Sequence, residues 1–199
     1  YWTAYLKANH PAEYMVSLLN SYIDNADKVG VAVDECRRLG MSVYLPDVTT
    51  GSVEFSMESL TDGAPVIRVG LADVKNVGVG AVKPFLAAKE NGKSFESIEQ
   101  MCRDVDLIGL GRKPLESLIM AGALDRFGDR SALLGVVDRI LSLAQSEGRL
   151  RDSGQTTMFD LFGESVPTPL VSIELDEVVT ADREKWAWER ELLGFSVSA

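Results

Sequence analysis

Two short glycine turns are the part of this sequence best suited to bind a charged ligand. One runs from Gly78 to Gly80 and the other from Gly109 to Gly111, at an offset of 31 residues. Each precedes a helix-forming run, and the first N–H groups of a helix have no hydrogen-bond partner within that helix. Glycine permits positive φ angles and lets the backbone approach a ligand closely, because it has no Cβ atom. Together with the positive end of the helix dipole, these features suit one phosphate group at each turn.

Basic side chains follow both turns, and their charge would add to a phosphate contact. Lys83 follows the first turn, while Arg112 and Lys113 follow the second. Ala81 stands directly after the first turn, and Pro114 in the second helix has no N–H to offer. The candidate DNA-binding residues are Val77, Gly78, Val79, Gly80, Ala81, Lys83, Gly109, Leu110, Gly111, Arg112 and Lys113.

The distribution of charge decides between this interpretation and a purely structural one. A lone glycine turn favours a tight connection between two helices, with Val77, Val79, Ile108 and Leu110 in the core. The net charge of the chain is −10, but it is divided into −5 for residues 1–67, +2 for 68–151 and −7 for 152–199. Because both turns lie in the only segment that phosphate would not repel, we favour DNA binding.

A second candidate site lies in the segment SGQTTMFDLFG, residues 153–163. Exposed aromatic groups gain nothing from water, so this cluster packs either onto residues 164–199 or onto a partner. Gln155 offers hydrogen bonds that fix register, Met158 adapts to an irregular apolar pocket and Phe159 supplies rigid buried area. The residues alone leave both possibilities open.

The elements that must position these sites are mostly helices. Hydrophobic periodicity and capping residues predict four of them. They are a helix after Pro11 that reaches about residue 22, one from Asp24 or Asn25 to Gly40, a short one with Ser94 as N-cap, and a long one beginning near Asp129. Alternation predicts a strand that Pro46 ends, and two further runs joined at Asp62-Gly63 predict a small β-hairpin.

Catalytic and metal chemistry find little support in the residue types. Cys36 and Cys102 lie in different segments without a CxxC pattern, and His10 is the single histidine, so we expect no zinc and a reducing cytosol. The acidic residues at 24, 27, 34 and 35, and at 189 and 191, have the helical spacing typical of a solvated face. No apolar run reaches membrane-spanning length, and the opening at Tyr1 suggests a piece of a longer protein.

The chain resembles the bacterial replicative DNA polymerases of family C, the DNA polymerase III alpha subunits. The resemblance rests on the order of YWTAYLKANHPAEYMVSLLN, DNADKVGVAVDECRRLGM, IRVGLADVKNVGVGAV, LESLIMAGALDRFG, GQTTMFDLFG and WERELLGF. It implies that residues 1–75 belong to the distal fingers and 76–150 to a tandem helix-hairpin-helix module on duplex DNA. Residues 151–199 would hold the clamp-binding segment and a connector toward a further C-terminal region.

The same resemblance implies the partners. Gln155, Thr156, Thr157, Met158 and Phe159 match the family's pattern for binding the sliding clamp, the beta subunit. Family members hold Mg²⁺ with palm carboxylates that have no counterpart here, so we expect no cofactor in this chain and no nucleotidyl transfer by it alone. Other replicase subunits would bind through regions outside this chain, and we expect a cytoplasmic location without a membrane partner. The alternatives are a free-standing helix-hairpin-helix protein of DNA repair or recombination, and a protein-only adapter.

Overall fold

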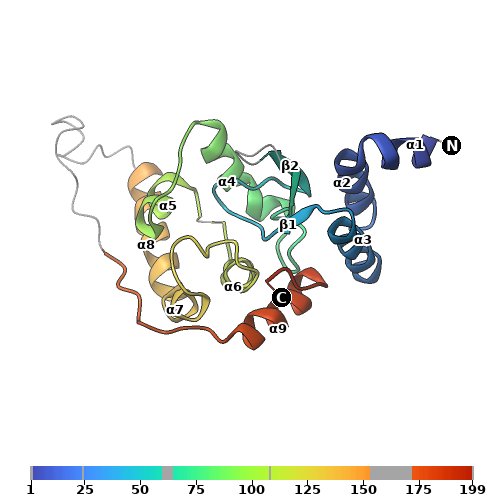
Figure 1. The fold of residues 1–199 in the computed structure, drawn as a ribbon. Helices are drawn as coiled ribbons and strands as arrows, with labels where there is room; N and C mark the ends of the chain where they lie inside the picture. Colours follow the sequence, from blue (N-terminus) through green and yellow to red (C-terminus); the bar gives the residue numbers. More distant parts are fainter. Residues whose placement is uncertain (1, 24, 60–64, 108, 153–171, 199) are drawn as a thin grey trace.

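Helices are the main regular structure of the described residues, as the hydrophobic periodicity predicts. The computed structural model describes residues 2–23, 25–59, 65–107, 109–152 and 172–198. In Figure 1, α1 to α3 lie at one end of the molecule and α5 to α8 at the other, with a small sheet and α9 between them. The helices are α1 (Trp2–Asn9), α2 (Pro11–Ser21), α3 (Ala26–Arg38), α4 (Val79–Glu90), α5 (Ile98–Asp104), α6 (Arg112–Met120), α7 (Arg130–Gly135), α8 (Val137–Asp152) and α9 (Asp182–Leu193).

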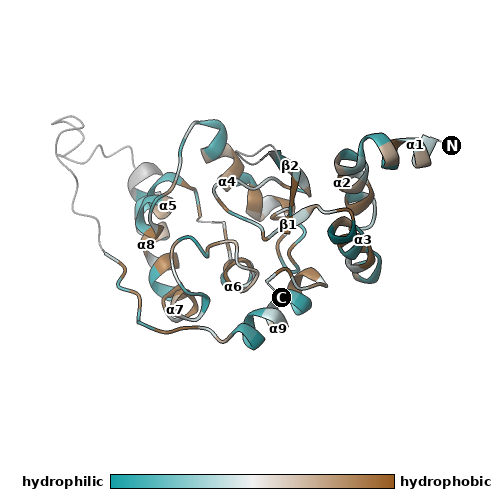
Figure 2. Cartoon of the chain, viewed as in Figure 1, coloured by the Kyte–Doolittle hydropathy of each residue, from teal (hydrophilic) through white to brown (hydrophobic). Residues whose placement is uncertain are grey.

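The first predicted helices form where the capping residues place them. Pro11 occupies the first turn of α2, where its missing N–H costs no helical hydrogen bond, and the helix buries Met15 and Leu19. Of the two N-cap candidates for α3, Asn25 takes the position, and its side chain accepts a hydrogen bond from the N–H of Lys28 at 3.1 Å. Figure 2 shows both hydrophobic and hydrophilic residues on α3, α4 and α7, as expected for helices with one buried face.

The sheet contains the predicted hairpin and, as β1, the strand predicted before Pro46. The strands β2 (Ser56–Ser59) and β3 (Pro65–Arg68) pair antiparallel, which confirms the hairpin. The strand β1 (Ser42–Tyr44) joins β3 on its other side in parallel, so the order is β1-β3-β2. Ile67 in the central strand is fully buried. Three residues are too short a run for a sequence pattern to reveal which strand they join.

One predicted helix start is wrong, and one predicted helix is divided in two. The N-cap of the short helix α5 is Ser97 rather than Ser94, because the hydroxyl of Ser97 accepts a hydrogen bond from the N–H of Gln100 at 3.2 Å. The predicted long helix does begin at Asp129, whose carboxylate accepts from the N–H of Ser131. It is interrupted at Val136, however, and the apolar face continues in α8 as a separate helix.

The C-terminal helix α9 packs back onto the first half of the chain. It ends at Gly194, whose φ of 86° is in the left-handed region that glycine adopts readily. A Cβ atom at this position would lie 2.8 Å from the Cβ of Ala26 at the start of α3. The carbonyl of Leu192 accepts a hydrogen bond of 2.9 Å from the N–H of Lys75. This hydrogen bond to α9 therefore fixes the backbone at Lys75.

Both cysteines are buried and unpaired. Burial raises the pKa of Cys36 to about 11 and that of Cys102 to about 12, so each remains a neutral thiol near pH 7. The described helices do not include one long and apolar enough to cross a membrane.

Candidate nucleic-acid interface

Both glycine turns lie directly at a helix start, as predicted. The second joins α5 to α6 and so forms a helix-hairpin-helix unit. The first leads into α4, but turns rather than a helix precede it over residues 71–76. The helix begins after the first glycine in one copy, with Gly78 as N-cap, and after the second glycine in the other, with Gly111 as N-cap. The two copies therefore differ by two residues in register.

The reason expected for the glycines is only half right. Positive φ angles are not needed, because φ is −86° at Gly78 and −71° at Gly111, and Gly80 and Gly109 also lack positive values. A Cβ atom at Gly78, Gly80 or Gly109 would meet nothing within 4 Å, and one at Gly111 would reach only the Cδ of Pro114 at 3.6 Å. The fold itself therefore does not require glycine at these four positions, and the backbone there is open to close approach.

Neither helix start is capped by a side chain. Gly78 and Gly111 offer none. The starts of α2 and α9 also lack a capping side chain, whereas Asn25, Ser97 and Asp129 cap α3, α5 and α7. An uncapped helix start presents N–H groups to solvent or to a ligand, together with the positive end of the helix dipole. These two ends can therefore accept an anionic oxygen.

The predicted site residues divide into an exposed and a buried set. Val77 and Leu110 are each 5% exposed and belong to the core, so their side chains anchor the turns instead of facing a ligand. Ala81 is half-buried, at the edge of the same core. The exposed members are Gly78, Val79, Gly80, Lys83, Gly109, Gly111, Arg112 and Lys113. The interpretation of these turns as tight connections between helices predicts this burial of Val77 and Leu110.

The basic residues are not equivalent. Arg112 donates a hydrogen bond to Glu116 at 2.6 Å and forms a second ion pair with Asp138 of α8. These hydrogen bonds raise the pKa of Arg112, and the one to Asp138 has the larger effect. Two acidic neighbours reduce the positive field that Arg112 presents outward. The i,i+4 spacing of Glu116 is a signal in the sequence for one of them, whereas no local pattern indicates the contact with Asp138. Lys83 and Lys113 are exposed.

The clamp-binding prediction falls outside the part of the chain that can be described. Gln155, Thr156, Thr157, Met158 and Phe159 lie within residues 153–171, which are not among the described residues. The assignment of these five residues stays a prediction.

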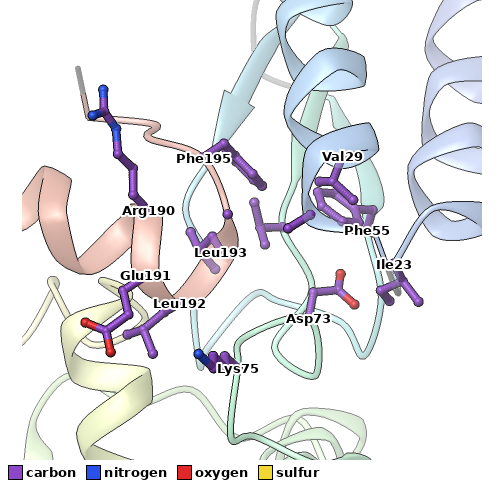
Figure 3. A pocket seen from close by; sticks show the side chains of 13 residues that line it. Ile23, Val29, Phe55, Asp73, Lys75, Arg190, Glu191, Leu192, Leu193 and Phe195 are labelled. Carbon is purple, nitrogen blue, oxygen red and sulfur yellow. The ribbon is translucent and has the colours of Figure 1, made fainter.

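A separate cavity of about 410 Å³ lies where α9 meets the start of α3 and the sheet (Figure 3). Asp73 lines it: one carboxylate oxygen accepts from the N–H of Gly70 at 3.1 Å and the other has no hydrogen-bond partner. Burial, with a smaller contribution from the charge of Glu54, raises the pKa of Asp73 to about 7. Lys75 and Arg190 line the same cavity. No pattern in the sequence marks Asp73 as different from other acidic residues.

One acidic residue was placed wrongly by its spacing. Glu189 is fully buried and forms an ion pair with Arg130, whereas its helical spacing with Glu191 predicted a solvated face. The hydroxyl and N–H groups of Ser198 and the N–H of Val197 also bind its carboxylate. Within the described ranges, no group of three or more histidine, cysteine, aspartate or glutamate residues is arranged to hold a metal ion.

Comparison with known proteins finds one matching family and a set of similar sequences. The family described as the helix-hairpin-helix motif matches residues 40–133, which include both turns. The DNA polymerase III subunit alpha of Mycobacterium tuberculosis (strain ATCC 25618 / H37Rv) is 38% identical over 208 residues, which cover 100% of this chain and 17% of that protein.

Two further relatives carry the same name. That of Thermus aquaticus is 35% identical over 199 residues, 100% of this chain and 15% of its own length. That of Escherichia coli (strain K12) is 35% identical over 165 residues, 82% of this chain and 14% of its own length. The chain spans between 14% and 17% of the length of these relatives. Along its whole length, this chain is therefore a homologue of one part of the DNA polymerase III alpha subunits, and it carries a helix-hairpin-helix motif.

Proposed function

We propose that this chain is the part of a bacterial replicative DNA polymerase that holds duplex DNA by its backbone. The observation that carries the proposal is the pair of uncapped helix starts at Gly78 and Gly111. A Cβ atom would be tolerated at both turns by the fold, so glycine there has a role outside the fold's own packing. Close approach of a phosphate group to the backbone N–H groups is such a role.

The chemistry of this contact predicts binding without sequence preference. Backbone N–H groups at a helix start reach phosphate oxygens but read no base edges. Val79, which is 50% exposed between the glycines, is apolar and offers no hydrogen bond to a base. Lys83 and Lys113 add positive charge on the same helices, α4 and α6. The contact therefore positions a duplex without recognising its base sequence.

On this proposal, DNA synthesis is carried out by a longer polymerase similar to these relatives, of which this chain is one part. The described residues of this chain contain no acidic cluster suited to Mg²⁺, so the palm carboxylates that bind the metal ions would come from elsewhere in the polypeptide. We place this polymerase in the cytoplasm, and the buried neutral thiols of Cys36 and Cys102 are compatible with reducing conditions there.

Clamp binding is the second part of the proposal and rests on sequence. Gln155, Met158 and Phe159 provide a hydrogen-bonding side chain and two apolar anchors over five residues. This combination fits a shallow apolar pocket on a partner. The sliding clamp would then be held by a segment that follows the DNA-binding helices in the chain.

Titration of fluorescently labelled DNA tests the proposal directly. The chain is titrated against two duplexes of equal length and unrelated sequence, in about 50 mM and about 200 mM salt. We expect similar affinities for both duplexes and a marked loss of affinity at the higher salt concentration. An absence of binding in low salt would favour a protein-only adapter, and a strong preference for one duplex would contradict recognition through the backbone.

A further inference from the structure

Asn76, directly before the first glycine turn, has an unusual backbone conformation. Its φ is 68°, and no other non-glycine residue in the described part of the chain has a positive φ angle. Asparagine tolerates this left-handed region better than most residues, but the conformation still persists only where the surroundings hold it. The chain reverses direction here, immediately before Val77 enters the core and Gly78 starts α4.

The side chain of Asn76 connects the first turn to the helix that begins at the second. Its Nδ2 donates a hydrogen bond to the hydroxyl oxygen of Ser117 at 3.2 Å, across 41 residues of sequence. Ser117 is 1% exposed and lies in α6, whose start is the uncapped end at Gly111. One hydrogen bond thus joins the two halves of the repeat.

The neighbours of Asn76 restrict the same stretch of backbone from other sides. The N–H of Lys75 donates to the carbonyl of Leu192 in α9, and Figure 3 shows these two residues on adjoining segments. The N–H of Val77 donates to the carbonyl of Val74 at 3.0 Å, and both valines are buried. The backbone is therefore fixed before and after Asn76, and the Asn76–Ser117 hydrogen bond ties it to α6.

We propose that Asn76 and Ser117 are positioning residues that hold the two uncapped helix starts in one fixed arrangement, so that both contact the same duplex at once. This inference rests on the proposed DNA-binding function. When two weak contacts are rigidly linked, the second forms without a further loss of rotational freedom, and the affinity of the pair exceeds that of either contact. Loosening the link removes this gain while each turn remains able to bind.

Ser117→Ala tests the proposal with little disturbance of the fold. It removes the acceptor, and the exposed amide of Asn76 can then bond to water, so no buried polar group loses its partner. Asn76→Gly is the companion variant, since glycine keeps the positive φ angle without strain but lacks the amide. For each we expect about fivefold weaker duplex binding, because the second contact no longer forms without a further loss of freedom. The melting temperature should fall by no more than a few degrees, the effect of one lost internal hydrogen bond.

Measuring the effect of Ser117→Ala in a second variant chain distinguishes a positioning role from a general loss of folded structure. In a chain that already carries Gly78→Asp, only one turn can bind, so Ser117→Ala should weaken binding no further. A general loss of folded protein would instead lower affinity by the same factor in both backgrounds, and that result would overturn the inference. Equal affinity of the wild-type and Ser117→Ala chains would also overturn it. If Gly78→Asp itself left duplex binding unchanged, the proposed function would fail as well.

Discussion

Arg130 of α7 donates a hydrogen bond from Nη1 to Oε1 of Glu189 in α9 at 3.1 Å, and these side chains are only 2% and 0% exposed. The guanidinium also binds the carboxylate of Asp125 and the carbonyl of Met120. Burial of Glu189 opposes ionisation, but hydrogen bonds from Ser198 and Val197 and the charge of Arg130 together lower its pKa. A fully paired buried charge thus joins the C-terminal helix α9 to α7, the helix that follows the helix-hairpin-helix unit of α5 and α6.

Breaking this pair should destabilise the chain strongly. Arg130→Met leaves the carboxylate of Glu189 buried without its cation, a change that costs about 3–5 kcal/mol in comparable pairs. Arg183→Ala on the exposed side of α9 is the matched control and should cost less than about 0.5 kcal/mol. Chemical denaturation measures both. An Arg130→Met chain as stable as the control would show that the pair does not hold α9 in place.

Ionisation of Asp73 should make the free energy of unfolding depend on pH. Its pKa is raised from 3.8 to about 7 in the folded chain, so folding favours the protonated form. The resulting stabilisation is complete below about pH 4 and is lost as the pH rises through 7, by at most about 4 kcal/mol for three pKa units. Glu189 has a lowered pKa and acts in the opposite sense, losing its contribution at more acidic pH.

Asp73→Asn isolates this effect, because the amide keeps the shape and cannot ionise. Between pH 5 and pH 8 the variant should lose less free energy of unfolding than the wild-type chain, and it should be the more stable of the two at pH 8. Asp176→Asn, at an exposed position, should leave the pH profile as it is. Parallel profiles for the wild-type chain and Asp73→Asn would contradict the assignment.

The glycines of the chain should fall into two groups when replaced by alanine. Gly194→Ala forces a left-handed residue, at a cost of about 1–2 kcal/mol, and brings its Cβ within 2.8 Å of Ala26. Gly80→Ala lies in α4 and meets nothing within 4 Å, so it should preserve stability or raise it by up to about 1 kcal/mol. Melting temperatures measure the contrast, and a large loss for Gly80→Ala would mean that the fold itself needs this glycine.

Clamp binding can be tested separately from DNA binding. Met158→Ala with Phe159→Ala should reduce affinity for a sliding clamp by about 2–4 kcal/mol, the range for anchors that fill pockets. Gln155→Ala should reduce it by about 1 kcal/mol through lost hydrogen bonds. Duplex binding should not change. If the double replacement lowered the melting temperature by many degrees and the wild-type chain failed to bind a clamp, these side chains would belong to the core of their own chain.

Local signals made much of this fold predictable. Pro11, Asn25 and Asp129 act within the first turn of their own helices, so their positions could be identified from sequence. The hairpin was equally accessible, because alternation and a turn dipeptide are local features.

The features that the sequence did not reveal depend on distant contacts. Glu189 is buried by a partner 59 residues away, and the sheet gains β1 through a parallel pairing with β3. In the candidate site, the glycine turns and their basic neighbours were visible as a repeat. The Arg112–Asp138 ion pair and the Asn76–Ser117 hydrogen bond cross 26 and 41 residues, and no periodicity marks them.

The central claim is that the uncapped helix starts at Gly78 and Gly111 hold DNA. Aspartate at both positions should cap α4 and α6 as Asp129 caps α7, so the fold should be kept while the N–H groups are occupied and negative charge faces the phosphate. Gly135→Asp adds the same side chain in open space at the last residue of α7 and serves as the control.

The decisive measurement is the affinity of these two chains for one labelled duplex at low salt, with melting temperatures recorded for both. We predict at least about a tenfold loss, about 1.4 kcal/mol, for Gly78→Asp with Gly111→Asp, and affinity within about twofold of wild type for Gly135→Asp. Undiminished binding by the doubly substituted, folded chain would contradict the claim that these helix starts contact DNA.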